Sequence, residues 1–338
     1  MTKKITIVLL IVMAVTILSY EVLHKGFVVT VQQPEVVAPT KPPLFVGDIM
    51  LGRYVETLSV KAKDELYPFT QTRDFLKQHT TIGNLEGPIP DVHKPTPING
   101  FSFSFPSSTP RILQEGGITA VSLANNHMFD KGRSGYEETK VALSAGGISH
   151  FGGYAPTTDD YFETKLGDKK VLIYGITMIA TGWDESQAYE VTEKLRSEHP
   201  DAYLMAYIHW GDEYVTQNRH QRAFAHELIE RGVDAIIGAH PHVVQGVEVY
   251  EGSPIFYSLG NFIFDQYWRD DLEDGYMVRV SDLEDTVRYE LIPIRSSRSV
   301  PVVATESTRE RILVAIAKQS DVSLVESIKK GYIDVYHK

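Results

Sequence analysis

One pattern recurs along the chain from Leu44 onward and restricts the fold more than any other feature. A short apolar segment is followed by a polar motif and then by a segment with helical periodicity. This alternation predicts an α/β layered fold with much parallel strand pairing, in which functional side chains gather where the strands end. The expected strands are residues 44–47, 81–84, 120–124, 171–176, 203–209, 235–238, 244–250 and 255–259. The expected helices are residues 68–78, 134–145, 188–197 and 218–231.

The residues after Gly275 lose this alternation. The segments YMVRVSDL and TVRYELIPI predict an antiparallel pair, and residues 321–330 predict a terminal helix. The only clear boundary in the chain lies near residue 43. We therefore expect residues 44–338 to form one domain with an added β edge.

The N-terminus predicts a membrane segment. Lys3 and Lys4 precede an uncharged run over residues 5–20, and the apolar character continues to Leu23. A helix over this run would reach roughly 28 Å, close to the ~30 Å hydrocarbon core of a bilayer. Because the run is long and lacks a small-x-small cleavage site, we expect residues 1–23 to be an uncleaved transmembrane helix, with a cleaved signal peptide as the alternative. The two lysines predict a single-pass protein of the cell membrane, with its domain outside the cytoplasm.

Residues 24–43 predict an extended linker between this anchor and the domain. They contain Pro34, Pro39, Pro42 and Pro43 and few large apolar side chains.

Composition removes several classes of function. The chain has 338 residues, of which 43% are hydrophobic and 23% charged, as in an ordinary globular protein. The net charge is -11 and no cluster of Lys and Arg is visible, which argues against nucleic acid as a partner. The sequence contains no cysteine, so disulfides, thiolate ligands, cysteine nucleophiles and a lipidated cysteine are excluded. It also lacks a Walker-type phosphate loop, and we expect no nucleotide cofactor.

Polar residues follow five of the expected strands. Since the carboxyl ends of parallel strands share one edge of a sheet, these side chains are predicted to meet on one rim. Carboxylate, amide and imidazole groups together suit Mn, Fe, Zn or Mg. The motifs are FVGDIMLGR with Asp48, TIGNLEG with Asn84 and Glu86, VSLANNHMFDKG with Asn125, Asn126, His127 and Asp130, YIHWGDE with His209, and IIGAHPH with His240 and His242.

Each of these residues also has a purely structural interpretation. Asp48 and Glu86 are common turn residues, the Asn pair could cap a helix, and a lone histidine such as His209 is more often a buried core residue than a ligand. The His240-Pro241-His242 segment is a stronger signal, because the proline must form a turn that lets both imidazoles converge. Five such coincidences on one rim favour a metal site.

The order of these motifs resembles that of the calcineurin-like metallophosphoesterases. More closely, GDIMLGR, NLEGPI, ANNHMFDKG, HWGDEY, GAHPHVVQG and YSLGNFIFD resemble the capsule synthesis protein CapA family, which is associated with poly-γ-glutamate capsules. The resemblance covers about residues 44 to 265. It implies a layered metallophosphoesterase-like α-β-β-α sandwich.

The resemblance also implies residue roles. Asp48 would ligate a first divalent metal ion, Glu86 would bridge two ions, and Asn126 would ligate the second, with two Mn, Fe or Zn ions expected. His127 would give a proton to a leaving oxygen, and Asp130 belongs to the same catalytic motif. The remaining metal ligands would be His209, His240 and His242. The residues that would contact the substrate or support the ligands are Asn84, Asn125, Trp210, Glu213 and Asn261.

Two positions depart from the phosphoesterase pattern. That pattern has Asp-x-His at its first motif, whereas this chain has Met50 after Asp48 and Ile49. Glu86 also stands where the pattern has an aspartate. These departures favour the metal position centred on Asn126, His209 and His240.

Three kinds of function follow from these residues. The first is a metal-dependent, phosphoesterase-like hydrolase that acts outside the membrane on a phosphoester, amide or ester of an envelope substrate. The second is a non-catalytic accessory subunit of a capsule polymer synthesis or export complex, with the other subunits and an anionic polymer as partners. A plain surface-binding module is the third, and the convergent ligands disfavour it.

Overall fold

The computed structural model describes residues 41–180 and 183–337, which belong to one compact unit, Thr40–Lys338. The predicted anchor and nearly all of the predicted linker lie outside the described residues. Within those described ranges, every helix is too short or too polar to span a membrane.

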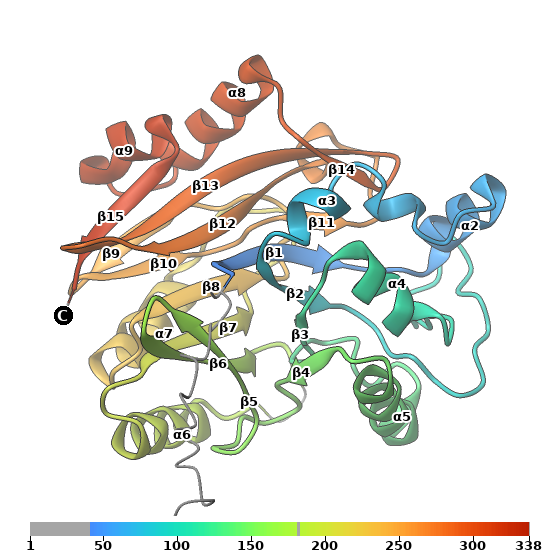
Figure 1. Ribbon diagram of the computed structural model, residues 1–338, viewed down its shortest axis with the longest axis horizontal. Helices are drawn as coiled ribbons and strands as arrows, with labels where there is room; N and C mark the ends of the chain where they lie inside the picture. The colour runs from blue at the N-terminus through green and yellow to red at the C-terminus, as the bar shows by residue number, and fades with distance from the viewer. Residues whose placement is uncertain (1–40, 181–182, 338) are drawn as a thin grey trace, which may run out of the picture. The chain divides into compact units, whose positions relative to one another are not determined.

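Helices and strands alternate through the first two thirds of this unit (Figure 1). The strands are β1 (Pro43–Ile49), β2 (Thr80–Leu85), β3 (Ala120–Ser122), β4 (Ser149–Phe151), β5 (Tyr161–Leu166), β6 (Lys169–Thr177), β7 (Tyr203–His209), β8 (Ala235–Ala239), β9 (Val247–Tyr250), β10 (Ser253–Phe256), β11 (Asn261–Ile263), β12 (Asp274–Asp282), β13 (Thr286–Ser297), β14 (Val300–Val303) and β15 (Tyr332–Tyr336). The α-helices are α2 (Arg53–Ala62), α3 (Arg73–Leu76), α4 (Thr109–Gly116), α5 (Gly132–Ala145), α6 (Glu185–Glu198), α7 (Arg219–Glu230), α8 (Glu306–Ala317) and α9 (Val325–Lys330), and the short 3-10 helices are η1 (Tyr67–Phe69), η2 (Asp270–Leu272) and η3 (Val322–Leu324).

The strands form two mixed sheets. The larger sheet has the order β14-β13-β12-β1-β2-β3-β4, with β11 added beside β1 and β15 beside β13. The smaller sheet has the order β5-β6-β7-β8-β10-β9. Neighbouring strands from β1 to β4, and from β6 to β8, run parallel, so their carboxyl ends lie at the same edge of each sheet.

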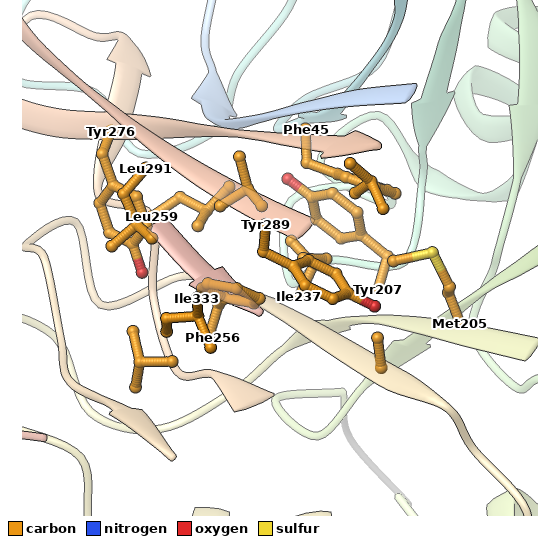
Figure 2. Close-up of a cluster of buried hydrophobic side chains, with 14 of the residues drawn as sticks. Phe45, Met205, Tyr207, Ile237, Phe256, Leu259, Tyr276, Tyr289, Leu291 and Ile333 are labelled. Carbon is orange, nitrogen blue, oxygen red and sulfur yellow. The ribbon is translucent and has the colours of Figure 1, made fainter. Parts of the chain in front are cut away.

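The two sheets pack face to face because alternate side chains of their strands are apolar on both faces. Phe45 of β1 points inward, whereas its neighbours Leu44 and Val46 point outward. Figure 2 shows the inner layer, where Phe45 approaches Tyr207 of the smaller sheet with ring centroids 6.3 Å apart. Helices α8 and α9 contribute to the same inner cluster.

Helices cover the outer faces of both sheets. Apolar residues of α2, α3, α4 and α5 pack on the outer face of the larger sheet, and those of α6 and α7 pack on the smaller sheet. The mixed α/β architecture predicted from the sequence is therefore confirmed. Two central sheets with helices on either side also hold the strand ends of β1, β2, β3, β7 and β8 close to one another.

The C-terminal strands differ from the expected added edge. β12 and β13 pair antiparallel, as predicted. However, β12 also pairs with β1, with Phe45 opposite Val278, so the hairpin lies inside the larger sheet. The reason is that β12 is buried along most of its length, with Tyr276 and Val278 in the inner layer and Met277 in the outer one.

Candidate metal centre

Five strand ends from both sheets converge on one cluster of polar side chains. Asp48 lies in register with Asn84 of β2 and Asn261 of β11, which joins two of these strand ends to the start of β11. This convergence requires a glycine before Asp48, since a Cβ on Gly47 would lie 1.8 Å from the carbonyl oxygen of Gly260. The side chains are deeply buried, with exposed fractions of 0% for Asp48, 1% for Glu86, 1% for His209, 5% for His240 and 3% for His242.

Asp48 is the hydrogen-bonding hub of the cluster. Its Oδ1 accepts a bond of 2.8 Å from Nδ2 of Asn84, and its Oδ2 accepts one of 3.3 Å from the backbone N–H of His240. Nδ1 of His242 lies 3.3 Å from the same Oδ2. Asp48 thus connects the larger sheet to the His-Pro-His turn.

A chain of amides fixes the orientation of His209. Asn125 donates to Oδ1 of Asn84 at 3.1 Å, so Nδ2 of Asn84 faces both Asp48 and Nδ1 of His209, the latter at 3.2 Å. Nδ1 of His209 must therefore accept, and its proton resides on Nε2. Nε2 donates to Oδ1 of Asn126 at 2.9 Å. This hydrogen bond pairs His209 with Asn126.

Other ligand atoms of the cluster form no hydrogen bond within the described ranges. Among the described residues, both carboxylate oxygens of Glu86 and Nδ1 of His240 are buried and form no hydrogen bond. Nε2 of His242 faces Oε1 of Glu86 at 3.9 Å. Ligand atoms of Asp48, Glu86 and His242 lie within 4.8 Å of one another, and so do those of Glu213, His240 and His242. Buried carboxylates and imidazoles left in this state fit a divalent cation.

Charge and burial act together on these groups. Burial raises the pKa of Glu86 to about 7, with the Asp48 carboxylate adding to the rise and His242 opposing it. Burial lowers the pKa of His240 to about 4, and it holds the pKa of His209 well below the usual value. Burial also disfavours the charged form of His242, but Glu86 and Asp48 outweigh it and raise the pKa of His242 to about 9.

The His-Pro-His turn converges as the sequence predicted, by means of an uncommon backbone conformation. His240 and His242 adopt φ angles of 95° and 60°. Residues with side chains rarely occupy this region, and such strain concentrates at functional sites. The ring centroid of His240 lies 4.5 Å from that of His209 and 5.9 Å from that of His242.

His127 borders the cluster together with Asp130. Its Nδ1 lies 2.8 Å from Oδ2 of Asp130, and its Nε2 lies 3.8 Å from Oε1 of Glu86. Burial disfavours a charged His127, but the hydrogen bond to Asp130 and the charge of Glu86 raise its pKa above the usual value. The ring of Phe103 stacks on the His127 imidazole with centroids 4.1 Å apart, and the backbone N–H of Phe103 donates to Oδ2 of Asp130 at 2.6 Å.

The other predicted residues fall into two places. Asn261 touches the cluster, since its Oδ1 lies 3.0 Å from Nδ1 of His242. Glu213 is exposed at the mouth of the cluster. Trp210 lies instead in the hydrophobic core, where it stacks on Tyr257 at 5.6 Å and donates from Nε1 to the carbonyl oxygen of Tyr257 at 2.8 Å.

Three contributors were not singled out from the sequence. Arg53 is buried in an ion pair with Asp265 and lies over the ring of Phe103 at 4.9 Å. Tyr214 stacks on His242 with centroids 5.9 Å apart. Arg53 and Tyr214 belong to the motifs GDIMLGR and HWGDEY, which were the available signal. Phe103 lies in no quoted motif.

Two packed sheets with a buried carboxylate and histidine cluster at their strand ends define an α/β protein with a candidate metal centre. The family described as "Bacterial capsule synthesis protein PGA_cap" matches residues 44–266. The chain belongs to this family, which confirms the relationship inferred from the motifs.

Curated relatives agree with this assignment. The chain is 27% identical to the "PGA biosynthesis protein CapA" of Bacillus subtilis, over 87% of this chain and 82% of that protein. It is 28% identical to the "Capsule biosynthesis protein CapA" of Bacillus anthracis, over 90% and 81%. A "Probable polyglutamine synthesis accessory protein" of Mycobacterium tuberculosis is 25% identical over 52% of this chain and 55% of its own length.

Proposed function

We propose that this chain is a membrane-anchored, extracytoplasmic protein of poly-γ-glutamate capsule biosynthesis or export, with a metal-dependent hydrolase site. One observation carries the hydrolase part. Buried ligand atoms of Glu86 and His240 have no hydrogen-bond partner among the described residues, and Nε2 of His242 faces Oε1 of Glu86. The names of the two Bacillus relatives support the capsule part, and the N-terminal apolar run supports the anchor.

The ligands that fit a divalent cation are Glu86, His240 and His242, with Asp48 beside them. Their oxygen and nitrogen atoms suit Mn, Fe or Zn, and the resemblance to phosphoesterases suggests two such ions. A divalent cation held there would polarise a phosphoryl or carbonyl oxygen and make a bound water more acidic. It would also supply local positive charge for an anionic polymer in a chain whose net charge is -11.

His127 is placed to move a proton. With Nδ1 hydrogen-bonded to Asp130, its Nε2 points toward Glu86 and the interior of the cluster. The hydrogen bond to Asp130 and the charge of Glu86 outweigh burial and raise the pKa of His127, which favours the protonated ring. His127 can therefore give the Nε2 proton to a leaving oxygen, while Asp130 holds the ring in orientation.

Elemental analysis of the purified full-length protein tests the metal centre. Wild type should retain Mn or Zn after dialysis, and Glu86→Gln and His242→Asn should lose most of it. Glu284→Gln is the matched control, because Glu284 is exposed in the turn between β12 and β13. Wild-type protein that holds no divalent metal would contradict the proposal.

A non-catalytic accessory role is the second candidate, favoured by the printed name of the mycobacterial relative. Capsule formation in cells that lack the native gene separates the two roles. The hydrolase role predicts that His127→Gln keeps its metal but does not restore the capsule. A capsule restored to the wild-type level by His127→Gln would favour the accessory role.

A further inference from the structure

The turn after β7 brings an exposed carboxylate to the open side of the cluster. Glu213 has a ligand atom within 4.8 Å of those of His240 and His242. Nδ1 of His240 is buried there without a hydrogen-bond partner among the described residues. An exposed carboxylate alone is no evidence of a site, but a buried and unpaired imidazole nitrogen beside it is.

The backbone holds this turn against the His-Pro-His segment. The N–H of Trp210 donates to the carbonyl of Ala239 at 3.2 Å, and the N–H of Tyr214 donates to that of Pro241 at 2.9 Å. Tyr214 adopts a φ of 67°, the same left-handed region as the two histidines. Glu213 therefore projects from a fixed turn beside the imidazoles.

A chain of hydrogen bonds orients His242 and reaches Tyr214, the residue next to Glu213. Asn261 donates from Nδ2 to Gln266 Oε1 at 3.0 Å and to the carbonyl of Leu272 at 3.1 Å, so its Oδ1 must accept from Nδ1 of His242. Gln266 in turn donates to the Tyr214 hydroxyl at 3.2 Å. This bond anchors Tyr214, which is next to Glu213 and whose ring stacks on His242.

The consequence for His242 is a defined ligand atom. Because Nδ1 is held by Asn261 and Asp48, Nε2 is the nitrogen that can exchange its proton for a metal ion. Supporting hydrogen bonds of this kind fix the orientation and the basicity of metal ligands. The same chain ends on Tyr214, so it links His242 to the turn that carries Glu213.

We propose that Glu213 is a metal ligand, which with His240 and His242 supplies the donor that is missing at Met50. Tyr214 is a positioning residue for it. This inference rests on the proposed metal centre and assigns it a ligand that the phosphoesterase pattern does not contain. The ligand approaches from the smaller sheet, whereas position 50 belongs to the larger one.

Calorimetric titration of metal-stripped full-length protein with Zn²⁺ or Mn²⁺ tests the proposal. Glu213→Gln should weaken binding by tenfold or more, and Tyr214→Phe, which keeps the ring on His242, by a smaller factor. The matched control Glu284→Gln should bind like wild type, and circular dichroism should show that every variant is folded. The titration measures the metal affinity of these variants rather than their turnover.

The outcomes separate the two proposals. If Glu213→Gln binds as tightly as wild type while Glu86→Gln does not, the metal centre stands and the role of Glu213 is overturned. If Tyr214→Phe alone is unchanged, the positioning role is overturned. If wild type binds neither ion, both the metal centre and its Glu213 ligand are wrong.

Discussion

The polar cluster contains two groups of side chains that differ in hydrogen bonding, here called its satisfied and its unsatisfied side. In the first, Asn84, Asn125, Asn126 and His209 are joined in a continuous chain of hydrogen bonds. In the second, both carboxylate oxygens of Glu86 and Nδ1 of His240 are buried but form no hydrogen bond within the described part of the chain. The satisfied side stabilises the fold, whereas the unsatisfied side costs stability and is available to a ligand. Convergence of side chains alone would not have distinguished the two.

The largest expected effect is the loss of the hub that joins both sides. Asp48→Ala should lower the free energy of unfolding by about 3 kcal/mol, because it leaves one amide N–H of Asn84 and the backbone N–H of His240 without their buried acceptor. Urea denaturation measures this. Asp285→Ala, an exposed control, should change the value by less than about 0.5 kcal/mol. Equal effects in the two variants would show that Asp48 stabilises nothing.

The satisfied side should affect stability rather than metal affinity. Asn125→Ala removes an amide that donates to Asn84 and to the carbonyl of Leu85 at 2.9 Å. We expect a loss of about 2 kcal/mol in unfolding free energy and only a small change in Zn²⁺ affinity. A loss of affinity as large as that of Glu86→Gln would remove the distinction between the two sides.

The unsatisfied side should show the opposite behaviour. Glu86→Gln replaces a buried carboxylate whose pKa is raised by burial, so the metal-free variant at pH 8 should be as stable as wild type or more stable by about 1 kcal/mol. Its Zn²⁺ affinity should fall by tenfold or more. Thermal unfolding with and without Zn²⁺ measures both effects. A metal-free variant that is clearly less stable than wild type would contradict this expectation.

The smallest expected effect comes from a buried histidine outside the cluster. His79 donates from Nδ1 to the carbonyl of Phe75 at 2.8 Å, and burial lowers its pKa below the usual value. The unfolded chain therefore binds the proton more readily, and stability should decrease as the pH falls below about 6.5. His79→Gln should lessen the stability difference between pH 7.5 and pH 5.5. An unchanged difference would assign the pH response to other groups.

Much of the fold could be predicted because the central strands are apolar on both faces. The strands that carry the cluster were predicted to within a few residues, as were α6 and α7. The predicted helix over residues 68–78 is instead divided into η1 and α3, with bonds of the i to i-3 type at Phe69 and Thr72 between them. Helices α2, α4 and α8 were not predicted.

The strand ends predicted which residues gather at the site, but they could not predict which of these residues are hydrogen-bonded to one another. The missing histidine at Met50 favoured the metal position centred on Asn126, His209 and His240. In the structure Asn126 and His209 are hydrogen-bonded to each other, whereas Nδ1 of His240 and both carboxylate oxygens of Glu86 form no hydrogen bond among the described residues. The orientation of Asn84 decides this, and it depends on Asp48 and Asn125, which belong to different strand ends. Sequence spacing carries no information about such long-range hydrogen bonds.

Anomalous X-ray scattering at the Zn edge, from crystals of the protein loaded with one equivalent of Zn²⁺, locates the bound ion. We expect the strongest peak at coordination distance from Glu86, His240 and His242. A strongest peak between Asn126 and His209, away from Glu86, would contradict it.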